Sequence, residues 1–116
     1  MNIVEHNKAP LYDAPGHQGM VMRRLQGKEA GPSQSAWIGL SVIEPGGGTT
    51  SSASDVEKFY VVLSGELTVV ARRGSLIQEV KLRPLDSCRI EPEEARQLIN
   101  QTSSPVTVLL VMPNKA

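Results

Sequence analysis

Three side chains that can bind an anion or transfer a proton, Lys58, Tyr60 and Arg96, lie in two short apolar segments of the sequence. The segment 58–63, KFYVVL, has the β-branched and aromatic composition of a strand, and alternate residues of a strand point to the same face. Lys58 and Tyr60 therefore share a face. An arginine can hold a carboxylate or phosphate through two parallel hydrogen bonds, and a lysine whose pKa is lowered by burial can act as a general base.

The rest of the chain predicts an all-β domain that would position these residues. Short apolar segments recur about every ten residues, separated by Gly, Pro and Ser, as in β-sandwiches and barrels. We expect strands at 20–27, 36–44, 58–63, 66–72, 76–82, 88–91, 96–101 and 106–112. Ser64-Gly65 predicts a hairpin turn, and Pro45 with the three glycines that follow it predicts the end of the strand from Ala36.

We expect one domain over residues 1–116, with an irregular N-terminal segment at 1–35, where one strand could form, and a barrel core at 36–113. Twelve basic and twelve acidic residues cancel without forming charged runs, which argues against nucleic-acid binding. The single cysteine, Cys88, cannot form an internal disulfide. The N-terminus lacks the apolar stretch of a signal peptide, and no apolar run is long enough to cross a membrane. These features predict a cytoplasmic protein that does not bind membranes.

The stretch 46–65 resembles the first motif of the cupin family, whose members are small double-stranded β-helix (jelly-roll) barrels. In that motif a glycine is followed by a His-x-His pair, a glutamate and a second glycine. Counted from Gly46, the two histidine positions hold Ser52 and Ser54, the glutamate position holds Lys58, and the final glycine is Gly65. The glycine frame is therefore kept, and the ligand positions are changed.

The stretch 84–100 resembles the second cupin motif, which normally has a Pro-Gly-Asp turn, a Pro-Gly corner, a histidine and an asparagine four residues later. Those positions hold Pro84-Leu85-Asp86, Glu91-Pro92-Glu93, Arg96 and Asn100. The two motifs and the strands between them cover residues 44–112. The resemblance implies a barrel whose interior is lined by Ser52, Ser54, Lys58, Tyr60, Val62, Arg96, Leu98 and Asn100.

The residues at the ligand positions do not suit the Fe, Mn, Ni or Zn ions that cupins bind, because these ions need imidazole nitrogen or carboxylate oxygen ligands. Serine hydroxyls are weak neutral ligands, and Lys58 and Arg96 carry positive charge with no free lone pair at neutral pH. The two histidines, His6 and His17, lie in the N-terminal segment. We therefore expect no metal and no other cofactor, unless Glu57, one residue before the glutamate position, turns inward.

These residues predict a metal-independent protein that binds a small carboxylated or phosphorylated metabolite in the barrel. Lys58 and Tyr60 would be the catalytic acid–base pair for an isomerisation, decarboxylation or dehydration. The ligand-binding residues would be Ser52, Ser54, Arg96, Leu98 and Asn100, with Arg96 as the anion anchor. Two alternatives stay open: non-catalytic binding or sensing of a small molecule, and an accessory subunit with a degenerate cupin pocket.

The two cations also have purely structural interpretations. Lys58 could reach solvent or pair with Glu57 or Asp55, and Arg96 could pair with one of the glutamates at 91, 93 and 94. A homodimer is expected in either case, because cupins commonly pair through sheet edges and N-terminal strands. The segment 21–25, VMRRL, and the continuous apolar strands would leave apolar surface exposed on a single barrel.

Overall fold

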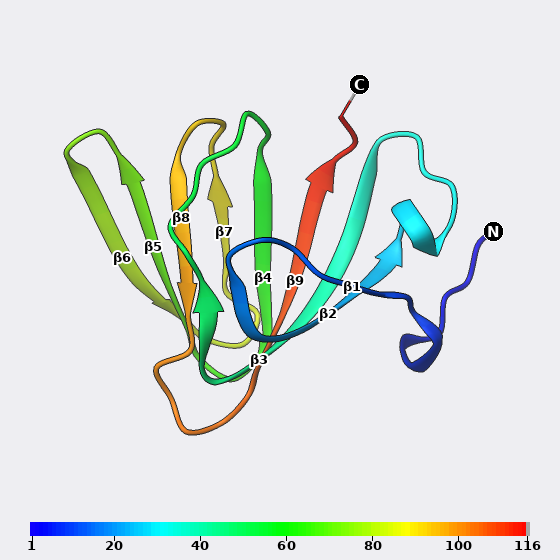
Figure 1. Cartoon of the computed structure of the whole chain (residues 1–116), viewed down its shortest axis with the longest axis horizontal. Coiled ribbons are helices and arrows are strands. Elements are labelled where there is room, and N and C mark those ends of the chain that lie inside the picture. The colour runs from blue at the N-terminus through cyan, green and yellow to red at the C-terminus, as the bar shows by residue number, and fades with distance from the viewer. Residues whose placement is uncertain (116) are drawn as a thin grey trace.

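Regular structure in this protein is almost entirely β-strand, as the computed structural model, which describes residues 1–115, shows (Figure 1). The strands are β1 (Leu11–Tyr12), β2 (His17–Gln26), β3 (Ala36–Thr49), β4 (Lys58–Ser64), β5 (Leu67–Arg73), β6 (Leu76–Leu82), β7 (Ser87–Ile90), β8 (Ala95–Ile99) and β9 (Val106–Pro113). Two short 3-10 helices, η1 (His6–Lys8) and η2 (Lys28–Ala30), lie in the N-terminal part. The predicted all-β, jelly-roll fold is confirmed.

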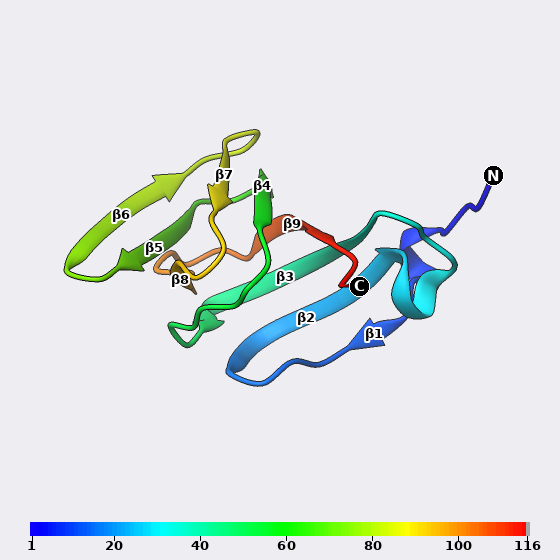
Figure 2. The same cartoon turned by 90° about the horizontal axis from the view of Figure 1, so that it is seen from above.

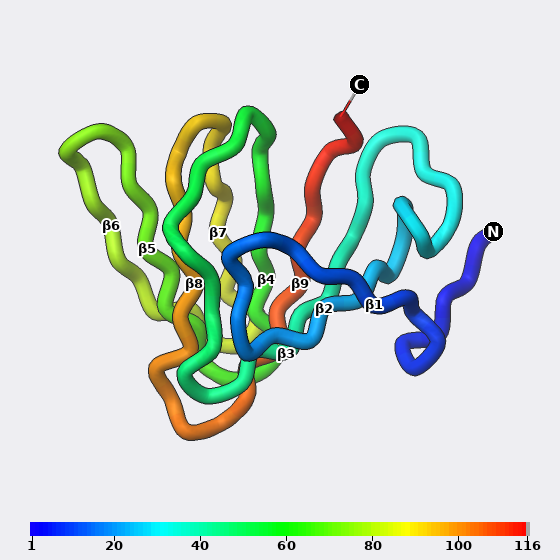
Figure 3. The backbone as a smooth tube through the Cα atoms, in the orientation of Figure 1, coloured from blue at the N-terminus to red at the C-terminus, as the bar shows by residue number. Residues whose placement is uncertain are grey.

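One antiparallel sheet forms the barrel, in the strand order β6-β5-β8-β3-β9-β4-β7. β2 pairs with β3 and with β1, so the predicted strand at 20–27 is part of a longer strand that belongs to the sheet. The sheet curls until its two end strands, β6 and β7, approach each other without forming a ladder in residues 1–115 (Figure 2). The N-terminus lies at the end of the molecule opposite β6 (Figure 3). No helix in that range is long and apolar enough to cross a membrane.

β3 is longer than the sequence predicted. We expected it to end at Pro45, but it continues through the three glycines to Thr49, and there it pairs with β8 instead of β9. Gly46 and Gly48 have φ angles of +80° and +157°, which a residue without Cβ adopts at little cost. A Cβ on Gly48 would lie 2.1 Å from the carbonyl oxygen of Leu98. The glycines therefore bend the strand into the second half of the barrel.

The barrel interior is packed with aliphatic side chains from both halves of the sheet. The buried apolar residues that pack together in this core are Ile43, Tyr60, Val62, Leu67, Val69, Leu82, Ile90, Leu98, Val106 and Val108. Along β4 the burial alternates, with positions 58, 60 and 62 inside and Phe59 and Leu63 outside. The predicted shared face of Lys58, Tyr60 and Val62 is confirmed.

The outer face of β2, β3, β4 and β9 is apolar and partly exposed. Val21 is 47 % exposed, Phe59 39 % and Leu63 40 %. A groove of about 530 Å³ on this face is lined by side chains that include Leu40 and Leu109. Within one chain the inner face of these strands is covered, and their outer face is left partly exposed. The homodimer stays a prediction, and a partner on this face would cover these residues.

Candidate functional site

The three predicted site residues meet on the concave face of the sheet. β4 supplies Lys58 and Tyr60, and β8 supplies Arg96; the exposed fractions of these residues are 6 %, 2 % and 6 %. We call these three residues the cationic cluster. The segment 50–57, between β3 and β4, runs across it and forms an isolated bridge in which the backbone of Ser52 pairs with that of Arg96. The fold therefore brings together residues from both motifs.

The Arg96 guanidinium is held by neutral oxygen atoms. Its Nε donates to the hydroxyl of Tyr60 at 2.8 Å. Its Nη1 lies within hydrogen-bonding distance of three oxygens: Thr49 Oγ1 at 3.2 Å, Thr50 O at 3.3 Å and Ser52 Oγ at 3.3 Å. Nη2 donates to no protein acceptor within residues 1–115. Two of the five N–H groups of Arg96 are thus left for another partner.

The Lys58 ammonium has one hydrogen-bond partner in the part of the chain described, the hydroxyl of Ser54 at 2.6 Å. The structural alternatives proposed for Lys58, exposure to solvent or an ion pair with a neighbouring carboxylate, are wrong for this structure. The two neighbouring carboxylates are held by other cations: Asp55 by Lys115 and Glu57 by Arg89. Lys58 is therefore a buried positive charge beside a single neutral oxygen.

Arg96 likewise has no carboxylate at ion-pair distance within residues 1–115, so the expected alternative of a structural pair at the corner is wrong. Glu91 instead forms ion pairs with Arg73 and Arg89, and Glu94 accepts a hydrogen bond from the backbone N–H of Glu91 at 3.0 Å. Two buried cations thus share one cluster without an anionic partner among the described residues.

The surroundings of Lys58 and Tyr60 shift the pKa values of these two residues in opposite directions. Burial, and secondly the charge of Arg96, lower the pKa of the Lys58 ammonium, while Asp55 acts weakly in the other direction. Burial raises the pKa of the Tyr60 phenol, and the nearby Arg96 charge offsets part of this effect. Tyr60 is therefore protonated at neutral pH and can donate a proton, and Lys58 is more easily deprotonated than an ordinary lysine.

The structure places the remaining predicted residues in different surroundings. The side chain of Asn100 is 1 % exposed; its amide donates to the carbonyl oxygens of Ile43 at 2.9 Å and Ser104 at 2.8 Å, and it accepts from Thr102. These bonds tie the loop after β8 to β3, away from the cationic cluster. Leu98 is a core residue and forms part of the apolar wall below Arg96.

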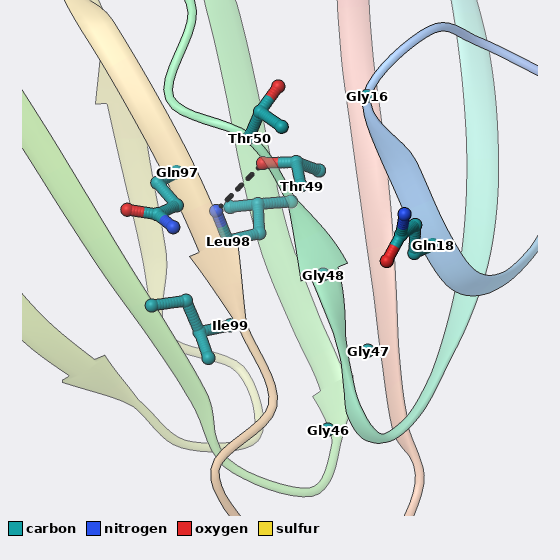
Figure 4. Close-up of a pocket in the computed structure, with 10 residues that line it drawn as sticks. All are labelled: Gly16, Gln18, Gly46, Gly47, Gly48, Thr49, Thr50, Gln97, Leu98 and Ile99. Carbon is teal, nitrogen blue, oxygen red and sulfur yellow. Dashed lines mark hydrogen bonds between the residues drawn. The ribbon is translucent and has the colours of Figure 1, made fainter.

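Sequence reasoning missed Thr49 and Thr50, which both accept hydrogen bonds from Arg96. Thr49 Oγ1 also accepts a hydrogen bond from the backbone N–H of Leu98 at 3.0 Å, which links the end of β3 to β8 (Figure 4). Beside them the glycines of β3 form the floor of a groove of about 300 Å³ between β2 and β8 (Figure 4). The spacing of the first motif gave no signal for the two threonines, because we expected the strand to have ended before them.

Comparison with known proteins agrees with this fold. The family described as "Cupin domain" matches residues 39–112. The chain is a cupin. It is 37 % identical over 112 residues to the β-D-galactosidase Rv1717 of Mycobacterium tuberculosis, an alignment that covers 97 % of this cupin and 93 % of that protein.

Solved structures share the fold of this cupin at low sequence identity. The polyketide cyclase RemF from Streptomyces resistomycificus has a TM-score of 0.83 and 20 % identity, with 99 % of this cupin and 80 % of that chain covered. A sugar phosphate isomerase from Silicibacter pomeroyi has a TM-score of 0.77 and 22 % identity, with 97 % and 75 % covered. These likenesses establish the fold of the cupin.

The residues at the cupin ligand positions do not fit a divalent metal ion. Lys58 and Arg96 would place two positive charges beside the ion, and Ser52 and Ser54 offer weak neutral oxygens. Glu57, the residue that could have supplied a carboxylate, is paired with Arg89. Within residues 1–115, no three or more His, Cys, Asp and Glu side chains gather closely enough to hold a metal.

Cys88, which lies opposite Tyr60 in the β4–β7 ladder, is expected to be a slow-reacting thiol. Burial raises the pKa of Cys88 from 9.0 to about 11, so the reactive thiolate is about 100-fold rarer near neutral pH than in an unfolded chain. Alkylation by iodoacetamide should therefore be about 100-fold slower in the native protein than in guanidinium chloride at the same pH. Equal rates in the two conditions would show that the thiol is not buried and that its pKa is not raised.

Proposed function

We propose that this cupin binds a small carboxylated or phosphorylated metabolite inside its barrel, with Arg96 as the anion anchor and no metal ion. One observation carries the proposal: Lys58 and Arg96 are both buried on the same interior surface, and neither has a carboxylate partner among residues 1–115. Removing a charge from water costs several kcal/mol unless an opposite charge compensates it. A bound anion would supply that charge.

The hydrogen bonds of the cluster indicate how the anion would enter. Segment 50–57 provides three of the five oxygens that now contact the two cations, from Thr50, Ser52 and Ser54. The backbone of Ser52 pairs with that of Arg96 through two hydrogen bonds, so the cluster is packed against this segment. An anion would displace the two serine hydroxyls and use the remaining N–H groups of Arg96 and Lys58. Binding therefore includes an outward movement of segment 50–57.

We also propose that the bound metabolite is transformed by acid–base chemistry. Neutral Lys58 would remove a proton from the carbon next to the anionic group, and the Tyr60 hydroxyl would donate a proton to an oxygen of the substrate. This arrangement suits isomerisation or dehydration. The rate should rise with pH as Lys58 loses its proton, because the base must be neutral to accept a proton.

Arg96→Met tests the anchor. Butanoate and inorganic phosphate are titrated into the wild-type protein and the variant by NMR. We expect at least one of these anions to bind the wild type, and the substitution to weaken its binding by at least about 30-fold, since truncating one side of a buried charged contact typically costs this much. Arg72→Met, at an exposed position on β5, is the matched control and should bind as the wild type does. Equal affinities in the wild type and in Arg96→Met would overturn the proposal.

A second candidate function, hydrolysis of a β-galactoside, is favoured by the 37 % identity to a protein named β-D-galactosidase over nearly the full length of both chains. Most glycosidases use two carboxylic acids, whereas this cluster has a phenol and two cations. The test is release of nitrophenol from 4-nitrophenyl β-D-galactoside by the wild type and by Tyr60→Phe. Turnover that is lost in Tyr60→Phe would place galactoside chemistry in this barrel and replace the anion proposal.

A further inference from the structure

We infer that the ligand of this site is a monoanion with an apolar body, and that the body lies in the cleft between β6 and β7. The inference rests on the proposed function, because the anionic group of the same ligand would be held by Arg96 and Lys58. It adds the chemical class of the rest of the molecule and the residues that would select it.

The cleft has a volume of about 260 Å³ and lies where the barrel is not closed by a ladder. Its walls are formed by inward-facing residues of β5, β6 and β7. Six of them are apolar or nearly so: Val69, Ala71, Val80, Leu82, Cys88 and Ile90. The thiol among them is uncharged at neutral pH, since its pKa is about 11. An apolar group would therefore lose water here against six uncharged side chains.

The cleft adjoins the cationic cluster on two sides, as the strand registers show. In the β4–β7 ladder, Ile90 lies directly opposite Lys58, and Cys88 lies directly opposite Tyr60. In the β5–β8 ladder, Ala71 lies directly opposite Arg96. The Cβ atoms of directly opposed residues are about 5 Å apart in antiparallel sheets. A ligand whose anionic group reaches Arg96 would therefore direct its body along these walls.

The charged residues of the cleft indicate that the end of the ligand inside it carries no second anionic group. The charged residues that line the cleft are Arg89 and Glu94. Arg89 is already paired with Glu57 and Glu91, whereas Glu94 has no ion-pair partner within residues 1–115. A carboxylate at this end of the ligand would face Glu94 and be repelled. The cleft therefore selects monoanions over dianions.

A chain-length series tests the inference on the wild-type protein. Acetate, butanoate and hexanoate carry the same anionic group, and NMR titration gives the dissociation constant of each. Burial of a methylene group should strengthen binding by up to about fourfold, so we expect hexanoate to bind on the order of 100-fold more tightly than acetate. Adipate, a dianion of the same length as hexanoate, should bind at least about tenfold more weakly than hexanoate.

Val80→Phe fills the cleft from β6 and should reduce the hexanoate-to-acetate ratio of affinities to nearly one. Val21→Phe makes the same change on the exposed outer face of β2 and should keep the wild-type ratio. Val80→Leu serves as a milder filling if the larger side chain prevents folding, and it should lower the ratio part of the way.

The outcomes separate the two proposals. If acetate binds through Arg96 but affinity does not depend on chain length, or if Val80→Phe keeps the dependence, the apolar cleft is wrong and the anion site stands. If none of the carboxylates binds the wild type, the inference fails, and if inorganic phosphate does not bind either, the proposed anion site fails with it. A hexanoate affinity that is equal in the wild type and in Arg96→Met would mean that the alkyl chain binds without the anchor, and this also overturns the inference.

Discussion

Replacing Lys58 with methionine is expected to raise the free energy of unfolding by about 1–3 kcal/mol and to abolish anion binding. The lysine is 6 % exposed and holds its charge beside one neutral hydroxyl, that of Ser54. Methionine is of similar length and carries no charge, so it would fill the same space without the cost of removing an ammonium group from water. A gain in stability together with a loss of binding is typical of a residue that is retained for its chemistry.

The stability gain should depend on pH in a defined direction. Because the pKa of Lys58 is lower in the folded than in the unfolded protein, the charged form is penalised by folding and the neutral form is not. The advantage of methionine is therefore complete below the folded pKa. It should shrink as the pH rises through the folded pKa towards the ordinary lysine value of 10.5.

Urea unfolding of the wild type and the variant, repeated across this pH range, measures the gain in stability and its dependence on pH. Lys81→Met on β6 is the matched control, since Lys81 is exposed and its replacement should change the free energy of unfolding by less than about 0.5 kcal/mol. If Lys58→Met were destabilising by 1 kcal/mol or more at neutral pH, Lys58 would be part of a stabilising structural network. The anion proposal would then lose its main support.

Much of this fold could be predicted from the sequence, because two motifs keep the backbone frame of a cupin even where the residues differ. Leu85 and Glu93 stand where the family has glycines, and both have positive φ angles, +74° and +69°. The left-handed turn is therefore preserved although non-glycine residues carry some strain there. Alternation along β4 was enough to place Lys58 and Tyr60 on one face, and the resemblance to the cupin motif implied that this face lines the barrel.

The rest of the site could not be predicted, because it depends on contacts between distant segments. The continuation of β3 through three glycines brings Thr49 beside Arg96, and no local pattern predicts where a bent strand finds its new partner. The absence of an ion pair between Lys58 and Asp55 also could not be predicted. Asp55 forms its ion pair with Lys115, a residue far along the chain. Periodicity predicts which face a side chain occupies, and tertiary contacts decide which partners it meets there.

Asn100→Ala is expected to lower the free energy of unfolding by about 2–4 kcal/mol, because it leaves buried hydrogen-bonding groups without partners. The lost bonds are those to the carbonyl oxygens of Ile43 and Ser104 and those from Thr102. The backbone of Asn100 also bonds to Gly46 and Gly47, so this residue lies where β3 crosses to β8. Loss of the side chain should therefore loosen the bend that places Thr49 beside Arg96.

Urea unfolding of the wild type and of Asn100→Ala measures this effect. Asn7→Ala is the control, because it makes the same chemical change at an exposed position in η1. The free energy of unfolding of the control should stay within about 0.5 kcal/mol of that of the wild type. Asn100→Asp should be more destabilising than Asn100→Ala, because its charge would face two carbonyl oxygens. Destabilisation with butanoate affinity changed by no more than about threefold in the folded fraction would assign Asn100 to the architecture of the barrel. If stability were unchanged and binding were lost, Asn100 would be a ligand contact, and the ligand would reach the bottom of the barrel rather than the cleft between β6 and β7.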